Sequence, residues 1–147
     1  PVVADRAARV VNTNDAEAAI DRMYDLCYLD PSRVHGERRA DQIEETRWRM
    51  ARHNAADPLR QSARGLGRAF IPGTSDYLWS MAERIEVPTL AIYGTHDKLV
   101  DPRLANRTAR TIPNVRVTTL KTGHVAQLED PVATARLVLQ MWSEDHI

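Results

Sequence analysis

The stretch "VRVTTLKTGHVAQLEDP", from Val115 to Pro131, decides the fold of this chain. It begins as an apolar strand, passes through Gly123 and His124, and ends in Asp-Pro, a pair that starts helices because Asp caps and Pro fits the first turn. An earlier stretch, "VPTLAIYGTHDKLVDP" from Val87 to Pro102, follows the same plan of apolar run, glycine, polar loop and Asp-Pro. The repeated order of strand, loop and helix predicts an α/β fold with a parallel sheet.

Two polar residues, Asp97 and His124, lie in the loops that follow the predicted strands. Because the carboxyl ends of parallel strands meet at one edge of a sheet, we expect these loops to lie side by side. A histidine in such a loop can be a surface residue, a metal ligand or a proton carrier, since imidazole titrates near neutral pH. The chain has no H-x-x-x-H, C-x-x-C or C-x-x-H spacing, so no metal site is predicted, and His96 is interpreted as a loop residue.

The residues before these strands show a helical period from about Asn14 to Ile85. A capping box at Asn14 and Glu17 starts the first of four predicted helices, which span about 14–30, 37–53, 58–71 and 75–85. The apolar positions that we expect to face inward, including those of the final helix, are Ile20, Met23, Tyr24, Cys27, Ile43, Trp48, Met50, Leu59, Ala63, Leu66, Phe70, Leu78, Met81, Ala82, Ile85, Ala135, Val138, Leu139 and Trp142.

Composition and charge narrow the class of protein. The 147 residues carry 20 basic and 20 acidic side chains, which favours neither a nucleic-acid nor an anionic-membrane partner. The single cysteine, Cys27, cannot form an internal disulfide. No apolar run approaches the ~20 residues that cross a bilayer, and the first residues lack the pattern of a signal peptide. We therefore expect a soluble, cytoplasmic protein of domain size, without a cofactor or metal, and its arginine-rich composition is typical of a GC-rich bacterial genome.

The two strand–loop–helix stretches resemble the carboxyl-terminal third of the α/β-hydrolase family. That family carries G-x-x-D-x-x-V-x-P after one strand and G-H-x-x-x-x-E-x-P after the next. The matching residues here are Gly94, Asp97, Val100, Pro102, Gly123, His124, Glu129 and Pro131. The resemblance covers Ile85 to Trp142, about the last two fifths of the chain.

The resemblance implies that Asp97 is the acid and His124 the base of a catalytic triad. A neutral imidazole can take a proton from a nucleophile and return it to a leaving group, and a carboxylate behind it stabilises the imidazolium. Gly123 is expected to allow a tight turn at the end of the strand, so that the ring faces the acid. Glu129 and Asp130 are interpreted as residues that start the last helix.

The helical part has a counterpart in the family as well. In many α/β hydrolases a helical cap precedes the seventh strand and covers the active site. We therefore predict a cap or lid region in residues 1–84 and the last part of the hydrolase core in residues 85–147. Trp79, Met81 and Val125 are candidate substrate-binding residues, although packing within the cap is the competing interpretation for Trp79 and Met81. Carbon–carbon bond hydrolases of the family often carry Trp after the histidine, so Val125 argues against that subclass.

The G-x-S-x-G motif that carries the nucleophile in this family is missing from the sequence. The stretch most similar to it, "GTSDY" from Gly73 to Tyr77, lacks the second glycine. Two strands also cover little of their helices, whereas the family's sheet has about eight strands. We therefore expect a fragment of a hydrolase for esters or similar bonds of a small apolar substrate, inactive alone, with the missing amino-terminal part on the same protein or on a second chain. The alternatives are a ligand-binding, non-catalytic member of the fold and a homodimer that pairs its strand edges.

Overall fold

The computed structural model describes residues 15–52, 56–74 and 77–144. Its contacts divide the chain into two compact units. The helical unit contains the described residues up to Asp25 together with Pro31–Leu78, and the sheet unit contains Leu26–Asp30 and the described residues from Trp79 onward. The chain therefore leaves the helical unit for five residues, joins the sheet unit, and returns. The predicted boundary between residues 84 and 85 stays a prediction.

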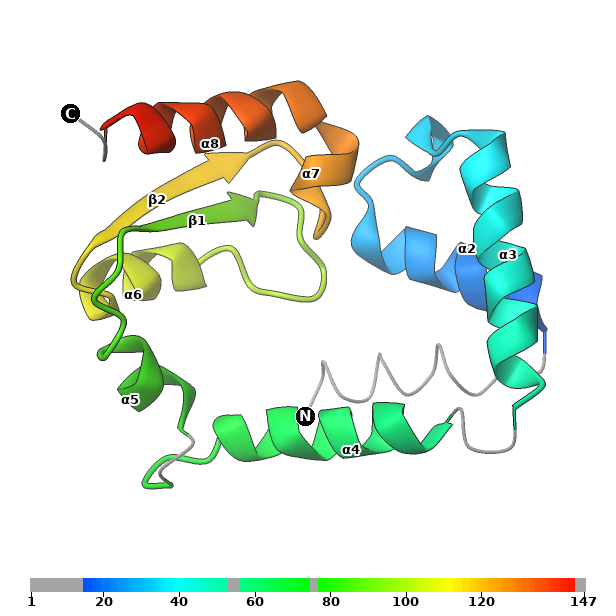
Figure 1. The fold of residues 1–147 in the computed structure, drawn as a ribbon, viewed down its shortest axis with the longest axis horizontal. Helices are drawn as coiled ribbons and strands as arrows, with labels where there is room; N and C mark the ends of the chain where they lie inside the picture. Colours follow the sequence, from blue (N-terminus) through cyan, green and yellow to red (C-terminus); the bar gives the residue numbers. More distant parts are fainter. Residues whose placement is uncertain (1–14, 53–55, 75–76, 145–147) are drawn as a thin grey trace. The chain divides into compact units, whose positions relative to one another are not determined.

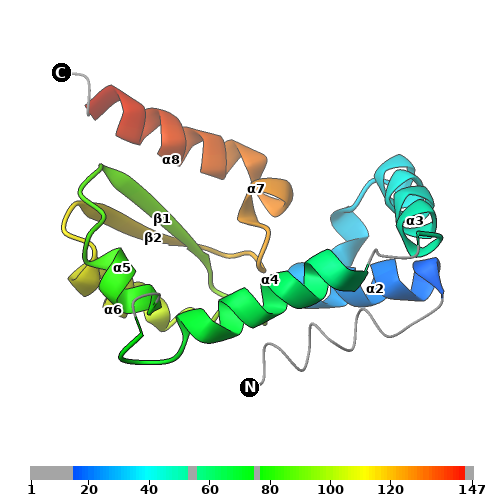
Figure 2. The ribbon, with the colours of Figure 1, turned by 60° about the horizontal axis from the view of Figure 1, so that its bottom comes forward.

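The sheet unit is built on two parallel strands, β1 (Thr89–Gly94) and β2 (Val115–Leu120). Their register pairs Thr89 with Val115 at one end and Gly94 with Leu120 at the other. The helices α6 (Leu104–Thr111) and α8 (Pro131–Glu144) lie on opposite sides of the strands, as both views show (Figures 1 and 2). This arrangement confirms the predicted α/β class, with two strand–helix units of a parallel sheet.

Polar contacts fix both helices to the strands. The hydroxyl groups of Tyr93 on β1 and Thr108 on α6 lie 2.6 Å apart, and Thr108 is buried. Arg116 on β2 forms an ion pair with Glu144 near the end of α8. Asp130 caps α8 as predicted, because its Oδ1 accepts the N–H of Ala133 at 2.9 Å.

The helical unit contains α2 (Ala16–Cys27, which ends in the sheet unit), α3 (Gly36–Met50) and α4 (Ala56–Ala69), with a short 3-10 turn at Pro31–Arg33. Ion pairs of Arg39 with Asp21 and of Arg47 with Glu17, at 2.7 and 2.9 Å, join α2 to α3. Among the described side chains of this unit, the buried apolar ones are Ala16, Ala19, Ile20, Tyr24 and Ile43. Asn14 and the side chain of Leu59, both used in the sequence analysis, lie outside the described residues.

Several positions predicted to face inward are exposed instead. They are Trp48, Met50, Ala63, Leu66, Phe70, Leu78, Met81, Ala135, Val138, Leu139 and Trp142. The fourth helix is also shorter than predicted, because α5 covers only Leu78–Ala82. Helices form where the period predicts them, but the described strands and short helices offer too little surface to cover the apolar face of every helix.

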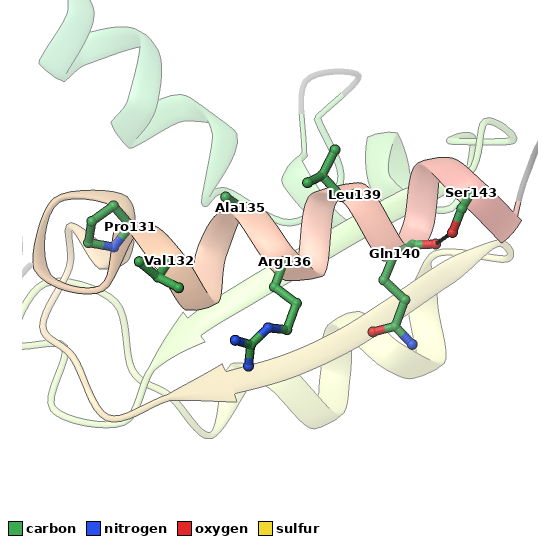
Figure 3. A pocket seen from close by; sticks show the side chains of 7 residues that line it. All are labelled: Pro131, Val132, Ala135, Arg136, Leu139, Gln140 and Ser143. Carbon is green, nitrogen blue, oxygen red and sulfur yellow. Dashed lines mark hydrogen bonds between the residues drawn. The ribbon is translucent and has the colours of Figure 1, made fainter.

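The final helix α8 shows this exposure most clearly. A groove of about 710 Å³ runs along it, lined by Pro131, Val132, Ala135, Arg136, Leu139, Gln140 and Ser143 (Figure 3). Leu139 and Trp142 are 67% and 65% exposed.

None of the described helices combines the length and the apolar character that crossing a bilayer requires.

Candidate active site

The structure brings the two predicted loop residues together. Nδ1 of His124 lies 2.9 Å from Oδ2 of Asp97, although the residues are 27 positions apart. The Asp97 side chain is 7% exposed and the His124 side chain 39% exposed. The acid is thus buried behind the ring, while the imidazole reaches solvent.

Asp97 is held by its own loop. Its Oδ1 accepts the N–H groups of Leu99 and Val100 at 2.7 and 2.9 Å, which leaves Oδ2 for the histidine. A loop that turns back over an aspartate in this way satisfies backbone donors and fixes the carboxylate at once. Both oxygens are therefore engaged, and their orientation is set by residues within three positions of Asp97.

The loops after the two strands remain bonded to each other beyond the sheet. The N–H of Thr95 donates to the carbonyl of Leu120 at 2.8 Å, and the N–H of His96 donates to that of Thr122 at 3.0 Å. At Gly94 the two backbones come so close that a Cβ would lie 1.9 Å from the carbonyl oxygen of Gly123. Only glycine fits there, because the obstacle is backbone and cannot rotate away.

The histidine loop packs against the segment Cys27–Asp30. The N–H of His124 donates to the carbonyl of Cys27 at 2.7 Å. A Cβ on Gly123 would lie 2.4 Å from that carbonyl oxygen and 2.7 Å from the nitrogen of Leu29. The chain does turn tightly after β2, where the N–H of Thr122 donates to the carbonyl of Leu120 at 2.9 Å, but among the described residues only Gly73 has a positive φ, so Gly123 does not use glycine's conformational freedom. Gly123 is required by close contact instead.

The geometry determines which ring nitrogen of His124 carries the proton. An ionised carboxylate can only accept hydrogen bonds, so Nδ1 of His124 must be the donor to Asp97. In the neutral ring Nε2 is then an acceptor, which is the state a general base needs. When Nε2 takes a proton, the adjacent carboxylate stabilises the positive charge that develops.

The thiol of Cys27 lies in the electrostatic field of this pair. Burial raises its pKa, and the negative charge of Asp97 raises it further. The thiolate is the reactive form of cysteine, so this environment suppresses nucleophilic reactivity. Cys27 contributes its backbone carbonyl to the site rather than an activated sulfur.

Glu129 has a different place from the one predicted. It ends the short helix α7 (Ala126–Glu129) and is buried, whereas the sequence analysis assigned it to the start of the last helix. Its carboxylate accepts backbone N–H groups from both the histidine loop and the segment Cys27–Asp30. Its spacing in G-H-x-x-x-x-E-x-P was visible in the sequence, but its partners were not.

The remaining candidate residues are placed as follows. Val125 is half-buried directly after His124 and precedes α7, and its carbonyl accepts the N–H groups of Leu128 and Glu129 in that helix. Trp79 lies on α5 with the guanidinium of Arg107 4.1 Å above its ring, which is a cation–π contact. Met81, also on α5, is exposed. The role of Trp79 and Met81 in substrate binding stays a prediction. Among the described residues, no three side chains of the metal-binding types converge.

Comparisons with known proteins agree with this fold. The family described as alpha/beta hydrolase fold matches residues 4–131 of this chain. A crystal structure of a protein assigned as a lipase, from Acinetobacter baumannii AYE, superposes with a TM-score of 0.65 at 19% sequence identity, over 86% of this chain and 42% of that one. Pyrrolizixenacetamide deacetylase from Xenorhabdus hominickii is 44% identical over 50 residues, which are 34% of this chain and 19% of the deacetylase.

The chain therefore spans less than half of the lipase structure, and its match to the deacetylase is a small part of that enzyme. At this level of identity the lipase speaks for the fold alone. The family match, in contrast, covers most of the chain and includes both strands and both loops of the candidate site. Together with the parallel strands, these findings show that the chain belongs to the α/β-hydrolase fold family.

Proposed function

We propose that this chain supplies the acid and the base, Asp97 and His124, of an esterase-type hydrolase. The observation that carries the proposal is the 2.9 Å contact between His124 Nδ1 and Asp97 Oδ2, at the adjacent ends of two parallel strands. The carboxylate is buried and fully hydrogen-bonded, and the ring is partly exposed. A pair built in this way can move a proton at Nε2 without changing its own geometry.

In the proposed reaction, His124 Nε2 accepts the proton of a nucleophile as the nucleophile attacks the ester carbonyl. The same nitrogen then returns the proton to the leaving alcohol, and it repeats the cycle with water to release the acid. Asp97 keeps the ring in the Nδ1–H form and stabilises the imidazolium. A serine nucleophile would serve an esterase, whereas an aspartate in its place would serve epoxide hydrolases or dehalogenases of the family.

The name of the similar deacetylase supports hydrolysis as the class of reaction, because a deacetylase removes an acetyl group. For this protein we propose an ester or similar bond in a small, apolar substrate. Val125, next to the base, and Trp79 and Met81, from the region proposed as the cap, are the candidate contacts to that substrate.

The nucleophile and the oxyanion hole are proposed to lie in a part of the hydrolase outside these 147 residues, because the sequence contains no G-x-S-x-G. The chain alone is then expected to be inactive. Residues 1–84 are proposed as the cap of the complete enzyme.

The first test is an intact-mass measurement on the polypeptide made by the cells that encode this sequence. A longer polypeptide or a second chain that carries a nucleophile motif is expected. That complete protein is then assayed with short-chain p-nitrophenyl esters and labelled with a fluorophosphonate. Hydrolysis and labelling, with turnover lost in His124→Asn, are the expected results.

Three outcomes would contradict the proposal. The first is ester turnover by the 147-residue chain alone that exceeds that of its His124→Asn variant. The second is a complete protein whose hydrolysis is unchanged by His124→Asn. The third is tight ligand binding without labelling or hydrolysis, which would identify the protein as a ligand-binding member of the fold.

A further inference from the structure

Glu129 is a buried carboxylate that the proposed proton transfer does not use. Its residue is 8% exposed, and it lies at the end of α7, five positions after the base. Oε1 accepts the N–H of Leu29 at 2.9 Å and that of Asp30 at 3.1 Å. Oε2 accepts the N–H of Gly123 at 2.5 Å. One side chain thus joins two segments that are about a hundred positions apart in the sequence.

The chemistry of this arrangement fits a carboxylate rather than an amide. All three partners are backbone donors, and an ionised carboxylate offers acceptors on both oxygens and no proton of its own. A glutamine of the same shape would accept at its oxygen but present an NH₂ group at the other position. That NH₂ would face another N–H, either of Gly123 or of the pair Leu29 and Asp30. The site therefore distinguishes Glu from Gln although their sizes are nearly equal.

The backbone that Glu129 holds is the backbone that carries the imidazole. The two peptide units on either side of the Gly123 Cα are both anchored: Gly123 N–H donates to Glu129, and His124 N–H donates to the carbonyl of Cys27. Both anchors lead to the same segment, because Glu129 also binds the amides of Leu29 and Asp30. A Cβ on Gly123 would collide with the backbone of Cys27 and Leu29, so the histidine loop and this segment are in direct backbone contact.

Asp97, in contrast, is fixed by the amides of its own loop and not by this segment. The two loops are hydrogen-bonded to each other as far as Thr122, so a displacement of Gly123 and His124 beyond that point would move the imidazole relative to the acid. The 2.9 Å contact between Nδ1 and Oδ2 therefore depends on two supports, of which one is local to Asp97 and the other runs through Glu129.

We infer that Glu129 is a positioning residue for His124: it binds the Gly123 amide to the segment Cys27–Asp30 and so sets the distance between the imidazole and Asp97. Its importance for catalysis rests on the proposed function, but its effect on the His124–Asp97 hydrogen bond does not. That bond can be observed in this chain without any hydrolysis.

The test is ¹H–¹⁵N NMR of the His124 ring in the 147-residue chain. In the unsubstituted chain, the proton on Nδ1 is expected to give a downfield resonance, assigned by its absence in His124→Asn. In Glu129→Gln this resonance is expected to be lost, while the amide resonances of β1 and β2 keep their positions. The matched control is Glu144→Gln, the same chemical change at an exposed carboxylate that pairs with Arg116 on β2. The control is expected to leave the ring resonance unchanged.

An unchanged ring resonance in Glu129→Gln would overturn the inference. So would a loss of that resonance only together with the strand amides, because this would show a purely structural role. If Glu129→Gln does not fold, the unsubstituted chain is titrated with urea instead. As urea is added, the ring resonance is expected to disappear at the same concentration at which the Gly123 amide loses its protection from exchange. The amides of β1 are expected to lose their protection only at a higher concentration. A ring resonance that persists after the Gly123 amide has lost its protection would refute the inference.

The same experiment separates the two proposals. Loss of the ring resonance in Glu129→Gln supports the positioning role even if the complete protein hydrolyses no ester. Hydrolysis that needs His124 but is accompanied by an unchanged resonance in Glu129→Gln supports the proposed function and overturns the positioning role.

Discussion

Replacing Gly94 by alanine is expected to destabilise the sheet unit strongly. The new Cβ would lie 1.9 Å from the carbonyl oxygen of Gly123 and 2.6 Å from that of Thr122, whereas ordinary contact begins at 3.4 Å. Adding a methyl group to a packed site costs ~1–3 kcal/mol, and more where the neighbours cannot move. Here the neighbours are backbone atoms, and the hydrogen bonds of Thr95 and His96 hold the two loops together. We therefore expect a loss of about 3 kcal/mol or more, a large share of the ~5–15 kcal/mol that stabilises a domain.

A matched control is Gly65→Ala in the middle of α4. A Cβ on Gly65 would have nothing within 4 Å, and the residue is exposed. Alanine is the better helix former by ~0.5–1 kcal/mol, so the same substitution is expected to stabilise there. The opposite sign at the two positions follows from contact alone, because neither glycine has a positive φ.

Hydrogen–deuterium exchange read by mass spectrometry is the suitable assay, because it reports on each peptide separately. The two units need not unfold together, and the midpoint of a single unfolding curve would average their stabilities. A loss of ~3 kcal/mol corresponds to a roughly hundredfold faster exchange in peptides from β1 and β2. Peptides from α4 are expected to exchange more slowly in Gly65→Ala. Unchanged exchange of β1 in Gly94→Ala would refute the reasoning about the close approach of the two backbones.

Three further predictions concern the site and its last helix. Asp97→Asn removes the acceptor of the His124 Nδ1–H, and turnover of the proposed complete hydrolase is expected to fall about 10⁴-fold, the loss found when a triad aspartate becomes asparagine; steady-state kinetics that show a loss below tenfold would contradict the proposed role of Asp97. Because burial and the charge of Asp97 raise the pKa of Cys27, its thiol is expected to react with iodoacetamide more slowly than a peptide cysteine at about pH 8. The midpoint of its rate–pH curve should fall in Asp97→Asn, and an equal midpoint would count against this account. Asp130→Ala removes the oxygen that accepts the Ala133 N–H, and amide exchange of α8 should report a loss of ~0.5–2 kcal/mol; undisturbed exchange would show that the cap is dispensable.

Much of the sheet unit could be predicted from local sequence. Each strand is an apolar run followed by a polar loop, and β1 and β2 both lie in these runs. The meeting of Asp97 and His124 follows from one rule, that parallel strands present their carboxyl ends at the same edge. Asp130 was recognisable as a cap because its partner lies only three positions away.

The features that could not be predicted from the sequence depend on contacts between residues that are far apart in the chain. Glu129 precedes an Asp-Pro pair and therefore looked like an acid at a helix start, but Leu29 and Asp30, which it binds, lie about a hundred positions away. No local pattern carries a pairing of that kind. Similarly, periodicity identifies the apolar face of α8 but not what covers it, and Leu139 and Trp142 are exposed.

The separation between Leu29 and Glu129 also fixes an order of events during synthesis. At ~5–20 residues per second, a ribosome adds Glu129 roughly 5–20 s after Leu29. Asp97 gains its loop partners within three residues of being made, whereas His124 must wait for the carboxylate that follows it. A nascent chain that ends between His124 and Glu129 would contain both members of the pair but not the carboxylate that binds the Gly123 amide.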